Sequence, residues 1–151
     1  MLVVGAGDRA AQAAALHLSA LGAAVVAAGP SLDGVVVTAG LVAASGGTVR
    51  VVERPAPPLA SAELVRLATE ALEPPTDAVL SAATYATRAA AHEAARELSS
   101  LLAPGARVAV LEAVPAGEER AAALRLVARF LPEGGSAGAA EGTGSLPIAQ
   151  A

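Results

Sequence analysis

The residues best placed to do chemistry come at the start of the chain, where Gly5-Ala6-Gly7 follows a short apolar run. With Ala10 in the third position, the spacing reads G-x-G-x-x-A. In a dinucleotide-binding turn, the first glycine allows a tight reversal and the second lets the backbone approach a pyrophosphate, whose charge then meets the N-terminus of the following helix. The pattern predicts that Gly5, Gly7, Asp8 and Ala10 contact NAD or NADP.

Asp8 also supports a second interpretation of this turn. A carboxylate at the start of a helix competes with a phosphate for the same amide groups, so Asp8 would cap the helix in place of a ligand. The second apolar run ends in Gly29-Pro30-Ser31, without the acidic residue that binds a ribose hydroxyl or an arginine for a 2′-phosphate. The sequence therefore does not distinguish NAD from NADP.

Composition excludes several other kinds of site. The net charge is -4 and aromatic residues make up 1% of the chain, so there is neither a basic field for a phosphate backbone nor a stacking platform for bases, and we expect no nucleic-acid partner. Cysteine is absent and His17 and His92 are the only histidines. We therefore expect no metal site, and we expect neither imidazole to be functional.

A stretch of the chain over residues 10–32 carries no formal charge, but Gly22 and Gly29-Pro30 break it into pieces too short to span a membrane. No basic segment precedes it, as a secretory signal would require. We expect a cytoplasmic protein that acts on a small-molecule substrate and has no membrane partner. Alanine-rich helices would also allow a homo-oligomer.

The elements that must position these residues follow from periodicity and breakers. Apolar runs predict strands over residues 2–4, 23–28, 35–37, 49–52, 77–82 and 107–111. Helical spacing predicts one helix ending at Gly22 and others starting at Ser61, Tyr85 and Glu118. The alternation predicts a Rossmann-like α/β domain over residues 1–131, with three layers and a doubly wound, mostly parallel sheet of about five to six strands. Residues 132–151, rich in Gly, Ala and Ser, are expected to form a flexible tail.

Two stretches resemble the short-chain dehydrogenase/reductase family. Leu32-Asp-Gly-Val-Val-Val-Thr-Ala-Gly40 resembles the strand that ends in the family's Asn-Asn-Ala-Gly motif, and residues 85–108 resemble its active-site helix and following strand. The resemblance implies a Rossmann fold that carries out NAD(P)-dependent hydride transfer between a carbonyl and an alcohol. It also implies that Ala39 and Gly40 lie at the cofactor.

The same resemblance implies catalytic roles. Tyr85 would protonate the carbonyl oxygen, Arg88 would take the place of the family's lysine one turn later, and Ser81 would orient the carbonyl. The simpler alternative is that Tyr85 packs its ring at a helix start with its hydroxyl in solvent. Arg88 would then belong to a solvated helix face with His92 and Arg96.

A second alignment takes residues 49–84 as the β-α-β unit, so that the strand over residues 77–82 ends at the cofactor. The two alignments exclude one another. The same region also resembles part of uroporphyrinogen-III synthase, an enzyme without a cofactor, of which it would match at most one lobe. The first expectation is therefore a divergent short-chain dehydrogenase/reductase-like oxidoreductase. The alternatives are a non-catalytic Rossmann-like interaction domain or a synthase-like lobe.

Overall fold

The computed structural model describes residues 1–30, 32–52 and 60–130. Within these residues, five strands form one sheet in the order β3-β2-β1-β4-β5, and every neighbouring pair is parallel. The strands are β1 (Leu2–Val4), β2 (Val25–Ala28), β3 (Val49–Val51), β4 (Ala78–Ser81) and β5 (Val108–Leu111). The predicted α/β, doubly wound, Rossmann-like fold class is confirmed.

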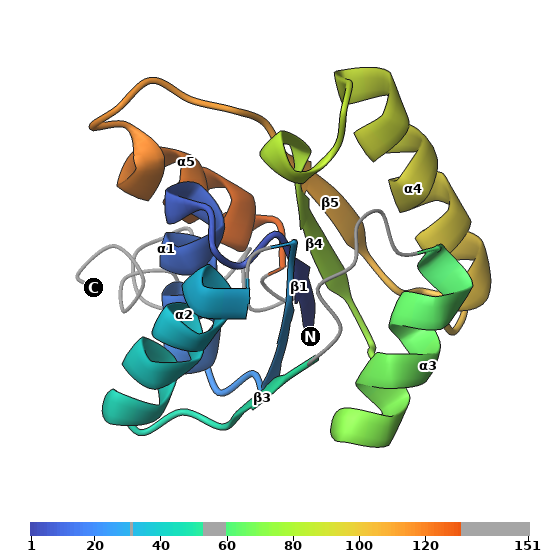
Figure 1. The fold of residues 1–151 in the computed structure, drawn as a ribbon, viewed down its shortest axis with the longest axis horizontal. Helices are drawn as coiled ribbons and strands as arrows, with labels where there is room; N and C mark the ends of the chain where they lie inside the picture. Colours follow the sequence, from blue (N-terminus) through green and yellow to red (C-terminus); the bar gives the residue numbers. More distant parts are fainter. Residues whose placement is uncertain (31, 53–59, 131–151) are drawn as a thin grey trace, which may run out of the picture.

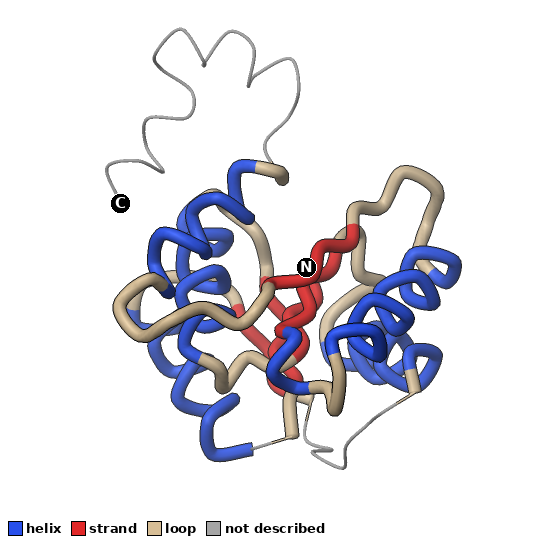
Figure 2. Tube along the Cα trace, turned by 90° about the horizontal axis from the view of Figure 1, so that it is seen from above, coloured by secondary structure: helices blue, strands red, loops and turns tan. Residues whose placement is uncertain are grey.

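Helices cover both faces of this sheet (Figure 1). One face carries α1 (Arg9–Ala20), α2 (Leu32–Ala44) and α5 (Glu119–Ala128), and the other carries α3 (Ser61–Ala71) and α4 (Arg88–Leu101). Seen from above, the strands run between these two helical layers (Figure 2). Alternate strand residues enter opposite cores: Val3 packs with α1, whereas Leu2 and Val4 pack on the α3 and α4 side.

The prediction of a strand over residues 35–37 is wrong, because this valine run lies inside α2. Val35, Thr38 and Val42 are buried, and their spacing of three and four residues places them on one helical face. Val36 and Val37 project outward and are exposed. The strand preference of valine is outweighed here by the burial of that one face.

Two helix starts also differ from the sequence prediction. Tyr85 does not begin a helix: it follows the short 3-10 turn η1 (Ala82–Thr84) in an extended conformation, and α4 begins at Arg88 with Thr87 as its N-cap. Ser61 is the first helical residue of α3 rather than its N-cap, which is Ala60. The Ser61 hydroxyl donates instead to the Ala94 carbonyl, 3.4 Å away, and so links α3 to α4.

The strand that lies beside β1 on the side away from β2 is β4. Its residues pair in register from Leu2 with Ala78 to Val4 with Leu80. The glycine turn is therefore approached from this side by β4 and the turn that follows it, and from the other side by the first turn of α2. From β1 the chain adds β2 and β3 on one side of the sheet, and it then crosses to add β4 and β5 on the other side. The position between β1 and β4 is therefore a topological switch point, which is where open α/β sheets bind ligands. Residues 132–151, the predicted tail, lie outside the described residues.

Candidate functional site

The glycine turn between β1 and α1 is fixed to the end of β2. Gly5 adopts a left-handed conformation (φ +81°), which glycine tolerates at little cost. The amides of Gly5 and Ala6 both donate to the Ala28 carbonyl, at 2.7 and 3.0 Å. A tight βα turn was predicted for these glycines, and it is present at the carboxyl edge of the sheet.

The chain itself fills the space that both glycines leave open. A methyl group on Gly5 would overlap Thr84 Oγ1 and lie 2.8 Å from Ser81 Cβ. One on Gly7 would lie 3.2 Å from the Cα atom of Gly34 in the first turn of α2. Internal packing therefore requires glycine at position 5, against η1, and leaves little room for a side chain at position 7, against α2.

The hydroxyl of Thr38, on α2, forms hydrogen bonds that hold the contact between Gly7 and Gly34 in place. Thr38 is fully buried, and its hydroxyl oxygen lies 2.5 Å from the Ala6 carbonyl and 3.2 Å from the Gly34 carbonyl. The Gln12 side-chain amide donates to the same hydroxyl at 3.1 Å. Thr38 therefore connects α2, α1 and the glycine turn, which is a structural role.

Asp8 is the N-cap of α1, and its carboxylate is held from two sides. Its Oδ2 atom accepts from the Ala11 amide at 3.4 Å and from the hydroxyl of Ser81 at 3.2 Å. Ser81 is itself 1% exposed. The predicted cap is therefore present, and a negative charge lies where helix amides would otherwise face a phosphate.

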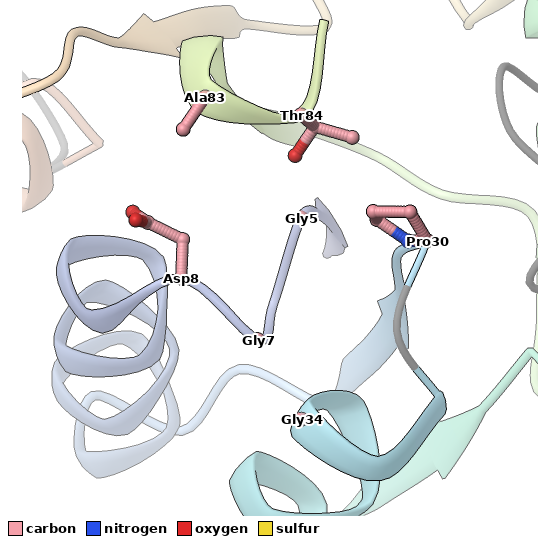
Figure 3. A pocket seen from close by; sticks show the side chains of 7 residues that line it. All are labelled: Gly5, Gly7, Asp8, Pro30, Gly34, Ala83 and Thr84. Carbon is pink, nitrogen blue, oxygen red and sulfur yellow. The ribbon is translucent and has the colours of Figure 1, made fainter.

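A pocket of about 190 Å³ opens at this point (Figure 3). The residues that line it are Gly5, Gly7, Asp8, Pro30, Gly34, Ala83 and Thr84. The side chains of Asp8 and Thr84 project into it from opposite sides. We refer to it as the switch-point pocket, because it lies at the carboxyl ends of β1 and β4.

The switch-point pocket does not fit the pyrophosphate of a dinucleotide. Asp8 supplies a negative charge at the α1 N-terminus, and Thr84 Oγ1 stands over Gly5, where a close backbone approach would be needed. Pro30 lines the pocket at the end of β2, so that strand end presents neither a carboxylate nor a guanidinium to a ribose.

The remaining predicted cofactor contacts lie away from this pocket. Ala10 is buried in α1 against the sheet. Ala39 and Gly40 lie on α2, and neither lines the switch-point pocket. They were placed at a strand end that the structure shows to be a helix.

The predicted catalytic residues separate onto the two faces of the sheet. Ser81 points toward α1, where it donates to Asp8, whereas Tyr85 packs against the core on the α3 and α4 side. Burial, together with the charge of Glu97, raises the pKa of the Tyr85 hydroxyl above its usual value of 10.0. A general acid and base near neutral pH needs the opposite shift.

Arg88 and Tyr85 line a second pocket of about 340 Å³, on the other side of η1. The lining consists of Ala82, Ala83, Tyr85, Ala86, Thr87, Arg88, Glu112 and Ala113; we call it the α4 pocket. Arg88 Nε donates to both carboxylate oxygens of Glu112, at 2.8 and 2.9 Å, and His92 Nε2 lies 3.1 Å from Glu112 Oε1. These two neighbours lower the pKa of Glu112, the hydrogen bond from Arg88 contributing most.

Sequence reasoning missed Glu112 and assigned no role to Thr84. Glu112 directly follows β5, and Thr84 ends the turn that follows β4. Both therefore reach the carboxyl edge of a parallel sheet, where ligands bind. That position in the chain was a signal that could have identified them.

The two histidines do not meet: His17 lies on α1 and His92 on α4, on opposite faces of the sheet. Burial and the charge of Arg120 lower the pKa of His17. Within the described ranges, no three His, Cys, Asp or Glu side chains come close enough to hold a metal ion.

No helix among the described residues is long and apolar enough to cross a membrane. No protein-family model, curated protein or solved structure matches this chain. A function can therefore be proposed only from the fold, the switch-point pocket and the α4 pocket.

Proposed function

We propose that this chain is a Rossmann-like binding domain whose ligand is a small hydroxylated molecule without a phosphate, such as a nucleoside. The observation that carries the proposal is the position of Asp8. Its carboxylate lines the switch-point pocket at the N-terminus of α1, where it repels an anion and accepts hydrogen bonds from a neutral or cationic ligand.

The polar atoms left unused in the pocket suit a pair of hydroxyl groups. Both hydrogen bonds that the Asp8 carboxylate accepts go to Oδ2, and Oδ1 has no hydrogen-bond partner among the described residues. The Thr84 hydroxyl likewise has no partner in the described part of the chain. A carboxylate oxygen only accepts, whereas a threonine hydroxyl donates and accepts. One hydroxyl of a vicinal diol can donate to Asp8 while its neighbour bonds Thr84.

The size of the pocket also favours part of a small molecule. Its volume of about 190 Å³ is below the roughly 300–1,000 Å³ of pockets that enclose a drug-sized ligand. A sugar ring fits this description better than a complete dinucleotide does. An attached base would lie over the rim formed by Pro30 and η1.

The test is calorimetric titration of the full chain with adenosine, 2′-deoxyadenosine and AMP. We expect adenosine to bind most tightly. Loss of one hydroxyl that donates to a carboxylate should weaken binding by about tenfold, and AMP should bind more weakly than adenosine because its phosphate faces Asp8. AMP binding more tightly than adenosine would refute the proposal.

A second candidate is the NAD(P)-dependent oxidoreductase that the family resemblance implies. It is favoured by the adjacency of β4 and β1, which brings residues 81–84 to the glycine turn as the second alignment requires. Its test is nicotinamide fluorescence during titration with NADH and NADPH, followed by turnover of a ketone panel by the chain and by Tyr85→Phe. The absence of a fluorescence change at millimolar concentrations of either cofactor would exclude it.

A further inference from the structure

The α4 pocket holds a set of donors that the switch-point pocket does not use. The Nη atoms of Arg88 and the hydroxyl of Tyr85 have no hydrogen-bond partner among the described residues, and both side chains line this pocket. The N-cap of α4, Thr87, lines it as well, so the positive end of that helix faces the same space. We propose that the α4 pocket binds a small carboxylate with a short apolar chain.

Arg88 is oriented before a ligand arrives. Its side chain is 76% exposed, and the Nε contacts with Glu112 hold the guanidinium at the edge of the pocket. The two Nη groups are left available for a second acceptor. A guanidinium offers several donors in a fixed plane, which allows one edge to bond the protein while another bonds a carboxylate.

The charge balance selects a monoanion. Glu112 remains ionised because Arg88 and His92 lower its pKa, and it offsets part of the charge of Arg88. A phosphate dianion would therefore meet repulsion that a carboxylate meets only in part. A carboxylate also has two oxygens, one for an Nη group and one for the phenol of Tyr85, which its raised pKa keeps protonated.

The remaining walls define the rest of the ligand. Ala82, Ala83, Ala86 and Ala113 contribute short apolar side chains, which suit a chain of a few carbons. Ala83 lines both pockets, so the two ligands would be held on either side of η1. This inference does not depend on the ligand of the switch-point pocket.

The test uses butyrate and its uncharged analogue butyramide as probes, with Tyr85 as the reporter. Tyr85 is the only tyrosine and the chain has no tryptophan, so tyrosine absorbance and fluorescence report on this pocket alone. We expect a saturable tyrosine signal with butyrate and none with butyramide. Bound butyrate should also move the alkaline titration midpoint of Tyr85 upward. Its carboxylate would add a negative charge near the phenol, besides the charge of Glu97 that already raises the pKa of Tyr85.

Three variants complete the test. Arg88→Gln should weaken butyrate binding by at least about tenfold, the usual effect of losing a hydrogen bond to a charged group. Arg96→Gln removes the same charge two turns further along α4, outside the pocket, and should change binding less than about twofold. Tyr85→Phe, followed by calorimetry, should weaken binding severalfold. Equal effects of the two arginine variants, or equal binding of the two probes, would overturn the proposal.

Discussion

The hydroxyl of Thr84 occupies the space that a side chain on Gly5 would need. Gly5 directly follows the central strand β1, and Thr84 ends the turn after the neighbouring strand β4, so this contact closes the carboxyl edge of the sheet at its switch point. The glycine turn, whose spacing resembles a cofactor motif, therefore packs against the turn that follows β4. The same contact places the Thr84 hydroxyl opposite the Asp8 carboxylate (Figure 3).

Substitution of Gly5 tests this contact. Gly5→Ala incurs the cost of a left-handed conformation and of overlap with Thr84. Gly22→Ala is the matched control, because Gly22 also has a positive φ but open space around it. We expect the free energy of unfolding to fall further for Gly5→Ala than for Gly22→Ala, by about 1–3 kcal/mol. Urea denaturation measures both, and equal losses would show that Thr84 does not restrict this position.

Substitution of the buried Thr38 on α2 should lower the free energy of unfolding. Thr38→Val keeps the shape of the side chain but leaves the Gln12 amide and the Ala6 carbonyl without their partner. We expect a loss of about 1–3 kcal/mol in the free energy of unfolding. Thr69→Val is the control, since that exposed hydroxyl bonds only the Val65 carbonyl of its own helix. The prediction fails if the two variants are equally stable in denaturant.

The alkaline titration of Tyr85 gives a prediction with a definite sign. Burial raises the pKa of its hydroxyl above 10.0 in the folded chain. The protonated phenol therefore contributes stability that is fully present below pH 10 and is lost as the pH rises through the folded-state value. Absorbance at the tyrosinate band should show a midpoint above that of the unfolded chain. A midpoint at or below the unfolded value would contradict the burial of the phenol.

Glu112 gives the opposite pH dependence. Arg88 and His92 lower its pKa below the usual 4.5, so its ionised form stabilises the fold above that value, and this stability is lost as the pH falls through the folded-state pKa. Glu112→Gln should therefore show a smaller decrease in urea midpoint between pH 7 and pH 3 than the parent chain. Glu93→Gln, an exposed neighbour on α4, is the control. An unchanged decrease in Glu112→Gln would show that the two contacts add nothing to stability.

The overall fold could be predicted from the sequence because its strands are short apolar runs separated by glycine and proline. The predicted strands at residues 49–52, 77–82 and 107–111 differ from β3, β4 and β5 only at their ends. The valine run at residues 35–37 misled the prediction, because strand preference and helical burial compete there and only the tertiary contacts of Val35 and Thr38 decide between them.

The candidate site was predictable only in part. Gly5, Gly7 and Asp8 do line a pocket, since they follow the central strand directly. Ser81 and Tyr85 are four residues apart in the sequence, yet the alternation of β4 and the turn of η1 send their side chains to opposite faces. The partner of Arg88 was not predictable from spacing, because Glu112 lies just after β5, 24 residues away.

The most direct test of the role of Asp8 is the ratio of adenosine to AMP affinity in Asp8→Ser, measured by calorimetry. Serine keeps an N-cap for α1 but removes the charge. Asp33→Ser removes the same charge from the start of α2, outside the pocket. We predict that the parent chain and Asp33→Ser prefer adenosine, whereas Asp8→Ser prefers AMP. A preference for adenosine that persists in Asp8→Ser would contradict the proposed function.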